Sequence, residues 1–171
     1  MVRFNLVITL LLMISIAVKA ELTNRMFDVR HVGYAEGLSS QRVFSIVEDG
    51  DGAMWIATKT GIDRYNGHTV KNYDLPGSFY YGDLAGRRLY LLYAAQQGLF
   101  AYDHTGRISR YSTILDHFEQ VLHLGQLIQE EVILNKLCLD SDGTWWMGAD
   151  KGLYKQEANH RIVAVLKGQY V

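Results

Sequence analysis

Two short stretches combine acidic side chains with glycine, and oxygen-rich loops of this kind bind calcium in many proteins. They are residues 49–52 (DGDG) and 140–143 (DSDG). Neither stretch has the acidic residues at the fifth and twelfth positions that an EF-hand calcium loop requires. Aspartate with glycine is instead typical of tight hairpin turns, because the carboxylate accepts turn amides and glycine adopts positive φ. We therefore predict hairpin turns here, with no metal ion and no cofactor.

The sequence offers no catalytic constellation. Its six histidines are scattered without the short spacing of a metal site. It has neither a nucleophile elbow nor a glycine-rich loop that cradles phosphate. We therefore expect this chain not to be an enzyme.

Three tryptophans are the side chains best suited to stack on a sugar ring. Trp55 and Trp146 occupy the same position of an internal repeat, which favours packing between structural units. Trp145 is the neighbour of Trp146 in a strand-like run, so the two side chains point to opposite faces. Trp145 is therefore the freer candidate for binding.

These residues lie in a stretch, 43–73, that reads as four short strands. The strand-like runs are 43–48, 53–58, 62–65 and 68–73, separated by breaks at 49–52, 59–61 and 66–67. Asn66-Gly67 predicts a type I′ hairpin turn, since both central residues of that turn have positive φ. A single four-stranded meander cannot bury both of its faces, so it must stack on similar units.

The same pattern returns 91 residues later without a gap. Five pairs match, namely Asp51 with Asp142, Gly52 with Gly143, Trp55 with Trp146, Gly61 with Gly152 and Ile62 with Leu153. An offset of this size accommodates two units of about 45 residues, a typical length for a propeller blade. We therefore expect an all-β protein of β-propeller blades, each a four-stranded antiparallel meander.

The expected blades are 43–75, 79–111 and 118–166, within a partial propeller at 43–171. The middle copy is degenerate, with Leu92 where the tryptophan should be and a strand at 79–82. Residues 112–131 are compatible with either a helix or a strand, because the spacing of their apolar residues fits both periods. We favour a strand, since the neighbouring segments are all predicted to be strands.

Composition indicates a globular chain. It is 49% hydrophobic with a formal net charge of −1, which argues against nucleic acid as a partner. The single cysteine, Cys138, excludes an internal disulfide. It lies in an apolar run, 132–139, and is expected to be buried as a small core residue.

Residues 1–20 have the features of a signal peptide, with Arg3 before an apolar run and Ala20 at a plausible cleavage point. An uncleaved anchor is the alternative, but the run has about 13 residues, short of the roughly 20 that span a bilayer. Residues 21–42 form a lead-in, with a possible strand at 27–32 that could complete the last blade of a closed ring.

Three segments resemble a known family. They are Gly-Leu-Ser-Ser at 37–40, Trp-Ile-Ala-Thr at 55–58 and Gly-Ile-Asp-Arg-Tyr-Asn-Gly at 61–67. Together they resemble the two-component regulator propeller repeat. The resemblance implies the periplasmic sensor of a Bacteroidota hybrid two-component system, exported and, in full-length relatives, anchored in the inner membrane ahead of a histidine kinase.

The resemblance also implies a ligand, such as a glycan or another small molecule, bound at the blade rims. Arg42, Arg64, Tyr65 and Trp145 are the residues expected there. The implied partners are the remaining propeller blades or a homodimer.

A propeller typically closes with four to eight blades, whereas this chain has room for three to three and a half. We therefore expect an incomplete ring and an N-terminal fragment that lacks the kinase and output domains. The alternatives are a non-signalling scaffold that assembles with other chains, or a propeller lyase or glycosidase, which rests on fold analogy alone.

Overall fold

The computed structural model describes residues 29–76, 88–157 and 161–168. The chain divides into two units, and the second begins at Val32. The signal peptide expected at 1–20 lies outside the described residues, as do the first two residues of the expected strand at 27–32; residues 29–32 are not strand. No helix in the described ranges is long and apolar enough to cross a membrane.

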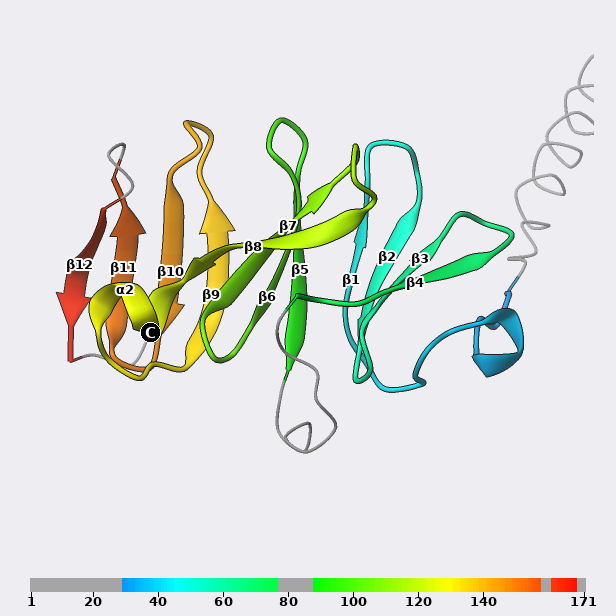
Figure 1. The fold of residues 1–171 in the computed structure, drawn as a ribbon, viewed down its shortest axis with the longest axis horizontal. Coiled ribbons are helices and arrows are strands. Elements are labelled where there is room, and N and C mark those ends of the chain that lie inside the picture. Colours follow the sequence, from blue (N-terminus) through cyan, green and yellow to red (C-terminus); the bar gives the residue numbers. More distant parts are fainter. Residues whose placement is uncertain (1–28, 77–87, 158–160, 169–171) are drawn as a thin grey trace, which may run out of the picture. The chain divides into compact units, whose positions relative to one another are not determined.

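The second unit contains three four-stranded antiparallel sheets, each built from consecutive strands (Figure 1). The first holds β1 (Val43–Glu48), β2 (Met54–Thr58), β3 (Ile62–Tyr65) and β4 (Val70–Tyr73), the second β5 (Leu89–Ala94), β6 (Gly98–Asp103), β7 (Arg107–Ser112) and β8 (His117–His123), and the third β9 (Leu134–Leu139), β10 (Trp145–Ala149), β11 (Gly152–Gln156) and β12 (Ile162–Lys167). A 3₁₀ turn, η1 (Tyr34–Glu36), precedes them. Meander sheets of this kind are propeller blades. The all-β prediction is confirmed, and the described residues form no closed ring.

The expected boundary between the second and third blades was wrong. β8 pairs with β7 and so belongs to the second sheet, which spans 89–123 rather than 79–111. The third spans 134–167 rather than 118–166. The ambiguous stretch 112–131 holds both structures, since β8 is followed by the short helix α2 (Leu124–Ile128). The strand expected at 79–82 lies outside the described residues.

The turn at Asn66-Gly67 differs from the predicted type I′ hairpin. β3 ends at Tyr65 and β4 begins only at Val70, and of the two turn residues only Gly67 has positive φ (92°). The Asn66 side-chain oxygen accepts the backbone N–H groups of His68 and Thr69 at 3.0 and 2.8 Å. This local cap stabilises a longer loop in place of the two-residue turn.

The repeated glycines Gly61 and Gly152 have a common physical reason. Gly61 immediately precedes β3 and Gly152 is the first residue of β11, and in both places the fourth strand passes close by. A Cβ at Gly61 would lie 2.9 Å from the carbonyl oxygen of Tyr73, and one at Gly152 would lie 2.0 Å from that of Leu166. Glycine is therefore required at this repeat position, because a side chain would collide with the backbone of the fourth strand.

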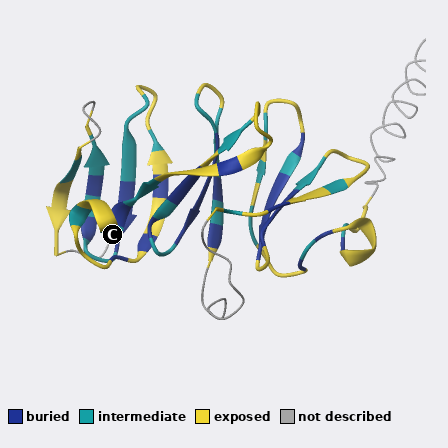
Figure 2. Cartoon of the chain, viewed as in Figure 1, coloured by how far each residue is buried: buried dark blue, intermediate teal, exposed yellow. Residues whose placement is uncertain are grey.

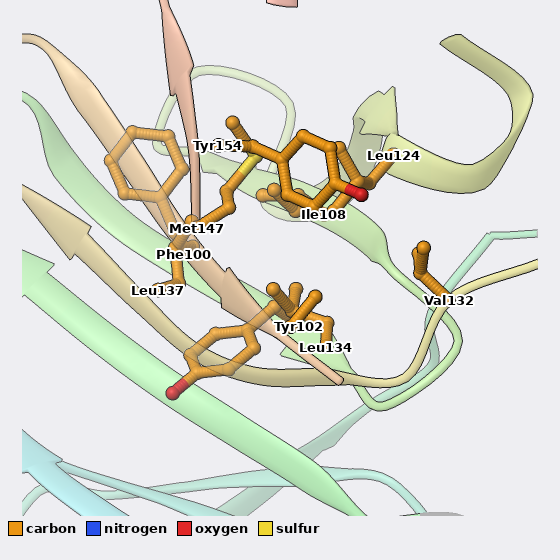
Figure 3. Packing of buried hydrophobic residues seen from close by; sticks show 10 residues of the cluster. Phe100, Tyr102, Ile108, Leu124, Val132, Leu134, Leu137, Met147 and Tyr154 are labelled. Atoms are coloured by element: carbon orange, nitrogen blue, oxygen red, sulfur yellow. The ribbon is translucent and has the colours of Figure 1, made fainter. Parts of the chain in front are cut away.

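Two apolar cores hold the sheets together, and Figure 2 shows them as buried bands along the strands. The first core lies between the first and second sheets and is centred on Trp55, which is 1% exposed. The second lies between the second and third sheets, where Ile108, Met147 and Tyr154 point toward one another (Figure 3). Each blade is thus stabilised by its neighbour.

The outer face of the third sheet explains two departures from expectation. Trp146 pairs with Cys138 in the register of β9 and β10, as Trp55 pairs with Val47 in β1 and β2. The second sheet covers the Trp55 face, whereas no described sheet covers the Trp146 face. Cys138 is therefore exposed, and its predicted burial was wrong. Packing between blades is confirmed for Trp55 but not for Trp146, which is only half-buried.

Candidate functional site

An aspartate joins the first two sheets beside the first core. The Asp116 carboxylate accepts the hydroxyls of Tyr73 and Tyr111 at 2.9 and 2.7 Å and also contacts the Lys71 ammonium. These bonds, the one from Lys71 foremost, hold the pKa of Asp116 well below its usual range. The Tyr73 and Tyr111 rings pack at tilted angles against Trp55, with ring centroids 5.1 and 4.6 Å away. These contacts connect β4 of the first sheet to the β7–β8 hairpin of the second.

Replacing Asp116 by Asn should make the protein less sensitive to acid. The folded-state pKa of Asp116 lies below the unfolded value of about 3.9, so its contribution to stability is present above that pH and is lost as the pH falls. Urea unfolding midpoints measured between pH 6 and pH 2 should therefore fall less steeply in Asp116→Asn than in the wild type. An identical slope for both proteins would contradict this linkage.

An aromatic residue and a cation face each other at the same place in every blade. On the second strand stand Trp55, Phe100 and Trp146, 45 and 46 residues apart. Directly opposite on the third strand stand Arg64, Arg110 and Lys155. Each cation lies over its ring, at 5.5, 5.8 and 5.6 Å from the centroid. Phe100, and not Leu92, is therefore the middle counterpart of the repeated tryptophan.

In the first blade an acid completes this pair. The Trp55 indole N–H donates to Asp49 Oδ2 at 2.7 Å, and Arg64 Nε lies 3.7 Å from the same oxygen. Burial favours the neutral acid, but bonds from Trp55 and from the Ala53 and Asp51 amides, with the Arg64 charge, lower the pKa of Asp49 overall. Asp49 is thus the turn-capping residue of the first acidic stretch. Arg64 Nε is itself buried without a hydrogen-bond partner.

An open hollow of about 770 Å³ lies beside this constellation, between the first and second sheets. It is bordered by the β1–β2, β5–β6 and β7–β8 turns, at the upper edge of the sheets in Figure 1. Its wall mixes charged, amide and aromatic groups, including Asp49, Arg64, Gln97, Arg110, Tyr111 and Glu119. Such a mixture suits a polar ligand with flat faces.

A second hollow of about 430 Å³ lies on the other side of the β5–β6 turn, between the second and third sheets. Trp145 lines it and packs edge-on against Phe100 at 4.6 Å. Four residues line both hollows, namely Gln96, Gln97, Arg110 and Val121. We call the two hollows together the inter-blade groove, because they flank one turn and share its side chains.

The structure brings two of the four predicted binding residues into this groove. Arg64 lines the first hollow and Trp145 lines the second. Arg42 instead lies over the Phe44 ring, and the Tyr65 hydroxyl donates to the Gly67 carbonyl oxygen at 2.8 Å; neither lines the groove.

Arg110, Gln96 and Gln97 were missed by sequence reasoning. A signal for Arg110 was present, because each repeated aromatic is followed nine or ten residues later by a cation. The shifted boundary of the second blade concealed it.

The remaining predicted motif residues have structural positions. Asp51 is exposed, and Gly52 and Gly143 adopt positive φ in their turns. Asp142 accepts the Thr144 amide at 2.9 Å. Among the described residues, no three His, Cys, Asp or Glu side chains gather as a metal site.

Comparison with known proteins gives both a repeat family and a fold. The model of the family described as "Two component regulator propeller" matches residues 37–60. No protein in the curated set matches the chain.

Among solved structures, the chain is similar to the extracellular domain of BT4673 from B. thetaiotaomicron, described as a hybrid two-component system. The identity is 20% and the TM-score 0.60, over 84% of this chain and 18% of that one. A second such domain, from BT3049 of the same organism, is 15% identical with a TM-score of 0.56, over 78% of this chain and 19% of that one. This chain thus spans less than a fifth of either domain.

Virginiamycin B lyase from Staphylococcus aureus is 14% identical, with a TM-score of 0.55 over 75% of this chain and 43% of the lyase. At such identities these likenesses show the fold alone. The match at 37–60 adds the repeat that the fold by itself would not specify. The chain therefore contains a two-component regulator propeller repeat at 37–60, and its meander sheets have the fold of propeller blades.

Proposed function

We propose that this chain is the extracytoplasmic, ligand-sensing propeller portion of a hybrid two-component sensor, and that the ligand binds in the inter-blade groove. The single observation that carries the binding site is the groove itself, which joins Arg64 and Trp145 across three blades. The repeat match and the likeness to extracellular domains of hybrid two-component systems support the role in signalling and a periplasmic location. The aromatic and amide side chains that line the groove suit an oligosaccharide.

A sensor of this kind must convert binding into a change of arrangement. The ligand supplies that energy only if it binds two arrangements of the protein with different affinity. Because the groove is lined by three successive sheets, a ligand that spans it contacts all of them and responds to their relative position.

Substitution of groove residues tests this proposal. We expect Arg64→Ala and Trp145→Ala each to weaken binding of an oligosaccharide about 10-fold or more, through loss of a charged hydrogen bond or of ring stacking. The probe is a library of oligosaccharides released from plant and microbial polysaccharides, measured by calorimetry. Arg42→Ala and Tyr65→Ala are matched controls outside the groove. Wild-type affinity in both groove variants would exclude the groove, and a library without any ligand would argue against glycan sensing.

We propose in addition that the outer face of the third sheet packs against a further sheet, from other blades or another chain. The supporting observation is that Trp146 and Cys138 form the same cross-strand pair as Trp55 and Val47. No described sheet packs over Trp146 and Cys138, whereas the second sheet packs over Trp55. Sedimentation of residues 21–171 tests this, with self-association expected. A well-folded monomer at all concentrations would count against it.

A further inference from the structure

Arg110 lies at the centre of the inter-blade groove. Arg110 lines both hollows and is exposed to solvent on β7. The Phe100 ring beneath its guanidinium is held edge-on by Trp145. The guanidinium is therefore presented from a packed aromatic surface and does not extend freely into solvent.

Arg110 differs from its counterparts in the residues of the adjacent hairpin turn. The turn of the first blade supplies Asp49 to Arg64, and the turn of the third blade is the acidic stretch 140–143. The turn of the second blade instead carries two neutral amides, Gln96 and Gln97.

The acid nearest in register is Glu119, opposite Arg110 on β8. Glu119 borders the first hollow but not the second, and its Oε1 lies 3.6 Å from His117 Nε2. The acid opposite Arg110 therefore borders only the first hollow.

The second hollow is consequently positive. Of the described residues that line it, Arg110 is the single charged one. The other polar groups there are the amides of Gln96, Gln97 and Gln156, while Trp145 supplies a flat apolar wall. A guanidinium flanked by amides binds carboxylate and sulfate groups through paired hydrogen bonds.

We propose that the second hollow binds the acidic group of the ligand, a carboxylate or sulfate carried by a saccharide, with Arg110 as its charged partner. This inference rests on the proposed function and specifies the class of ligand. Trp145 would stack against the ring that bears the acidic group, while the rest of the ligand extends toward Arg64.

The test compares acidic oligosaccharides with their own neutral forms. Each acidic member of the library is paired with the product of carboxyl reduction or desulfation, and binding is measured by calorimetry. In the wild type, neutralisation should weaken binding about 10-fold or more. Arg110→Gln should weaken binding of the acidic form by the same factor as neutralisation does in the wild type. This variant should therefore bind the acidic and neutral forms with equal affinity. Arg110→Lys, which keeps the charge but loses the forked geometry, should fall between.

Lys155→Gln is the matched control, because it removes the cation at the same repeat position but outside the groove. It should keep the preference for the acidic form. Circular dichroism of each variant verifies folding. The inference is overturned if acidic and neutral forms bind the wild type equally, or if Arg110→Gln keeps the preference; the proposed function then stands. If no form binds the wild type, the proposed function fails as well.

Discussion

Replacing Trp55 by Ala should lower the free energy of unfolding by about 3–5 kcal/mol, the usual loss when a large buried aromatic residue is removed. Trp55 is 1% exposed and lies between two sheets, where its ring contacts Tyr73, Tyr111 and Phe118. It also donates its indole N–H to Asp49. The substitution removes all of these contacts together and leaves a cavity in the first core. Urea unfolding followed by circular dichroism measures the loss.

Trp146→Ala is the matched control for this prediction. Trp146 has the same repeat position and lies beneath a cation in the same way, at 5.6 Å from Lys155. It is half-buried, on a face that no described sheet covers, so we expect a loss of about 1 kcal/mol. Equal losses in the two variants would show that cover by the next sheet is not what stabilises Trp55.

Asp63→Ala should lower the free energy of unfolding by about 2–4 kcal/mol, because it leaves several donors without an acceptor. The Asp63 carboxylate is fully buried. It accepts the Ser39 backbone N–H at 2.9 Å, the Ser39 hydroxyl at 2.8 Å and the Asn72 side-chain amide at 2.7 Å. This network joins the segment 37–40 to β3 and β4. The measurement is urea unfolding, combined with hydrogen exchange of the Ser39 amide, which should become faster.

Asp51→Ala is the control for the loss of an acidic side chain. Asp51 is exposed in the β1–β2 turn, so its removal should change stability by no more than about 0.5 kcal/mol. If Asp63→Ala also proved neutral, the buried network would not hold the lead-in segment to the first blade. Tyr154 stands at the repeat position of Asp63 in the third sheet, so the third sheet lacks this carboxylate.

Much of the fold follows from local residue patterns. The match of Asp51–Ile62 with Asp142–Leu153 predicted recurring blades, because turn aspartates and glycines fix short strands wherever they occur. Gly61 and Gly152 follow the same logic, since close approach of the fourth strand admits no side chain. The all-β fold and the hairpin turns at 49–52 and 140–143 were therefore predictable from sequence alone.

What the sequence left open depends on which sheet covers which face. Alternation correctly separated Trp145 from Trp146, but only the neighbouring sheet decides which of the two is buried, and the same holds for Cys138. β8 could be assigned to the second sheet only through its pairing with β7, a contact between strands that local periodicity does not encode. The groove arises in the same way, because Arg64, Arg110 and Trp145 come from three sheets that meet only when the blades stack.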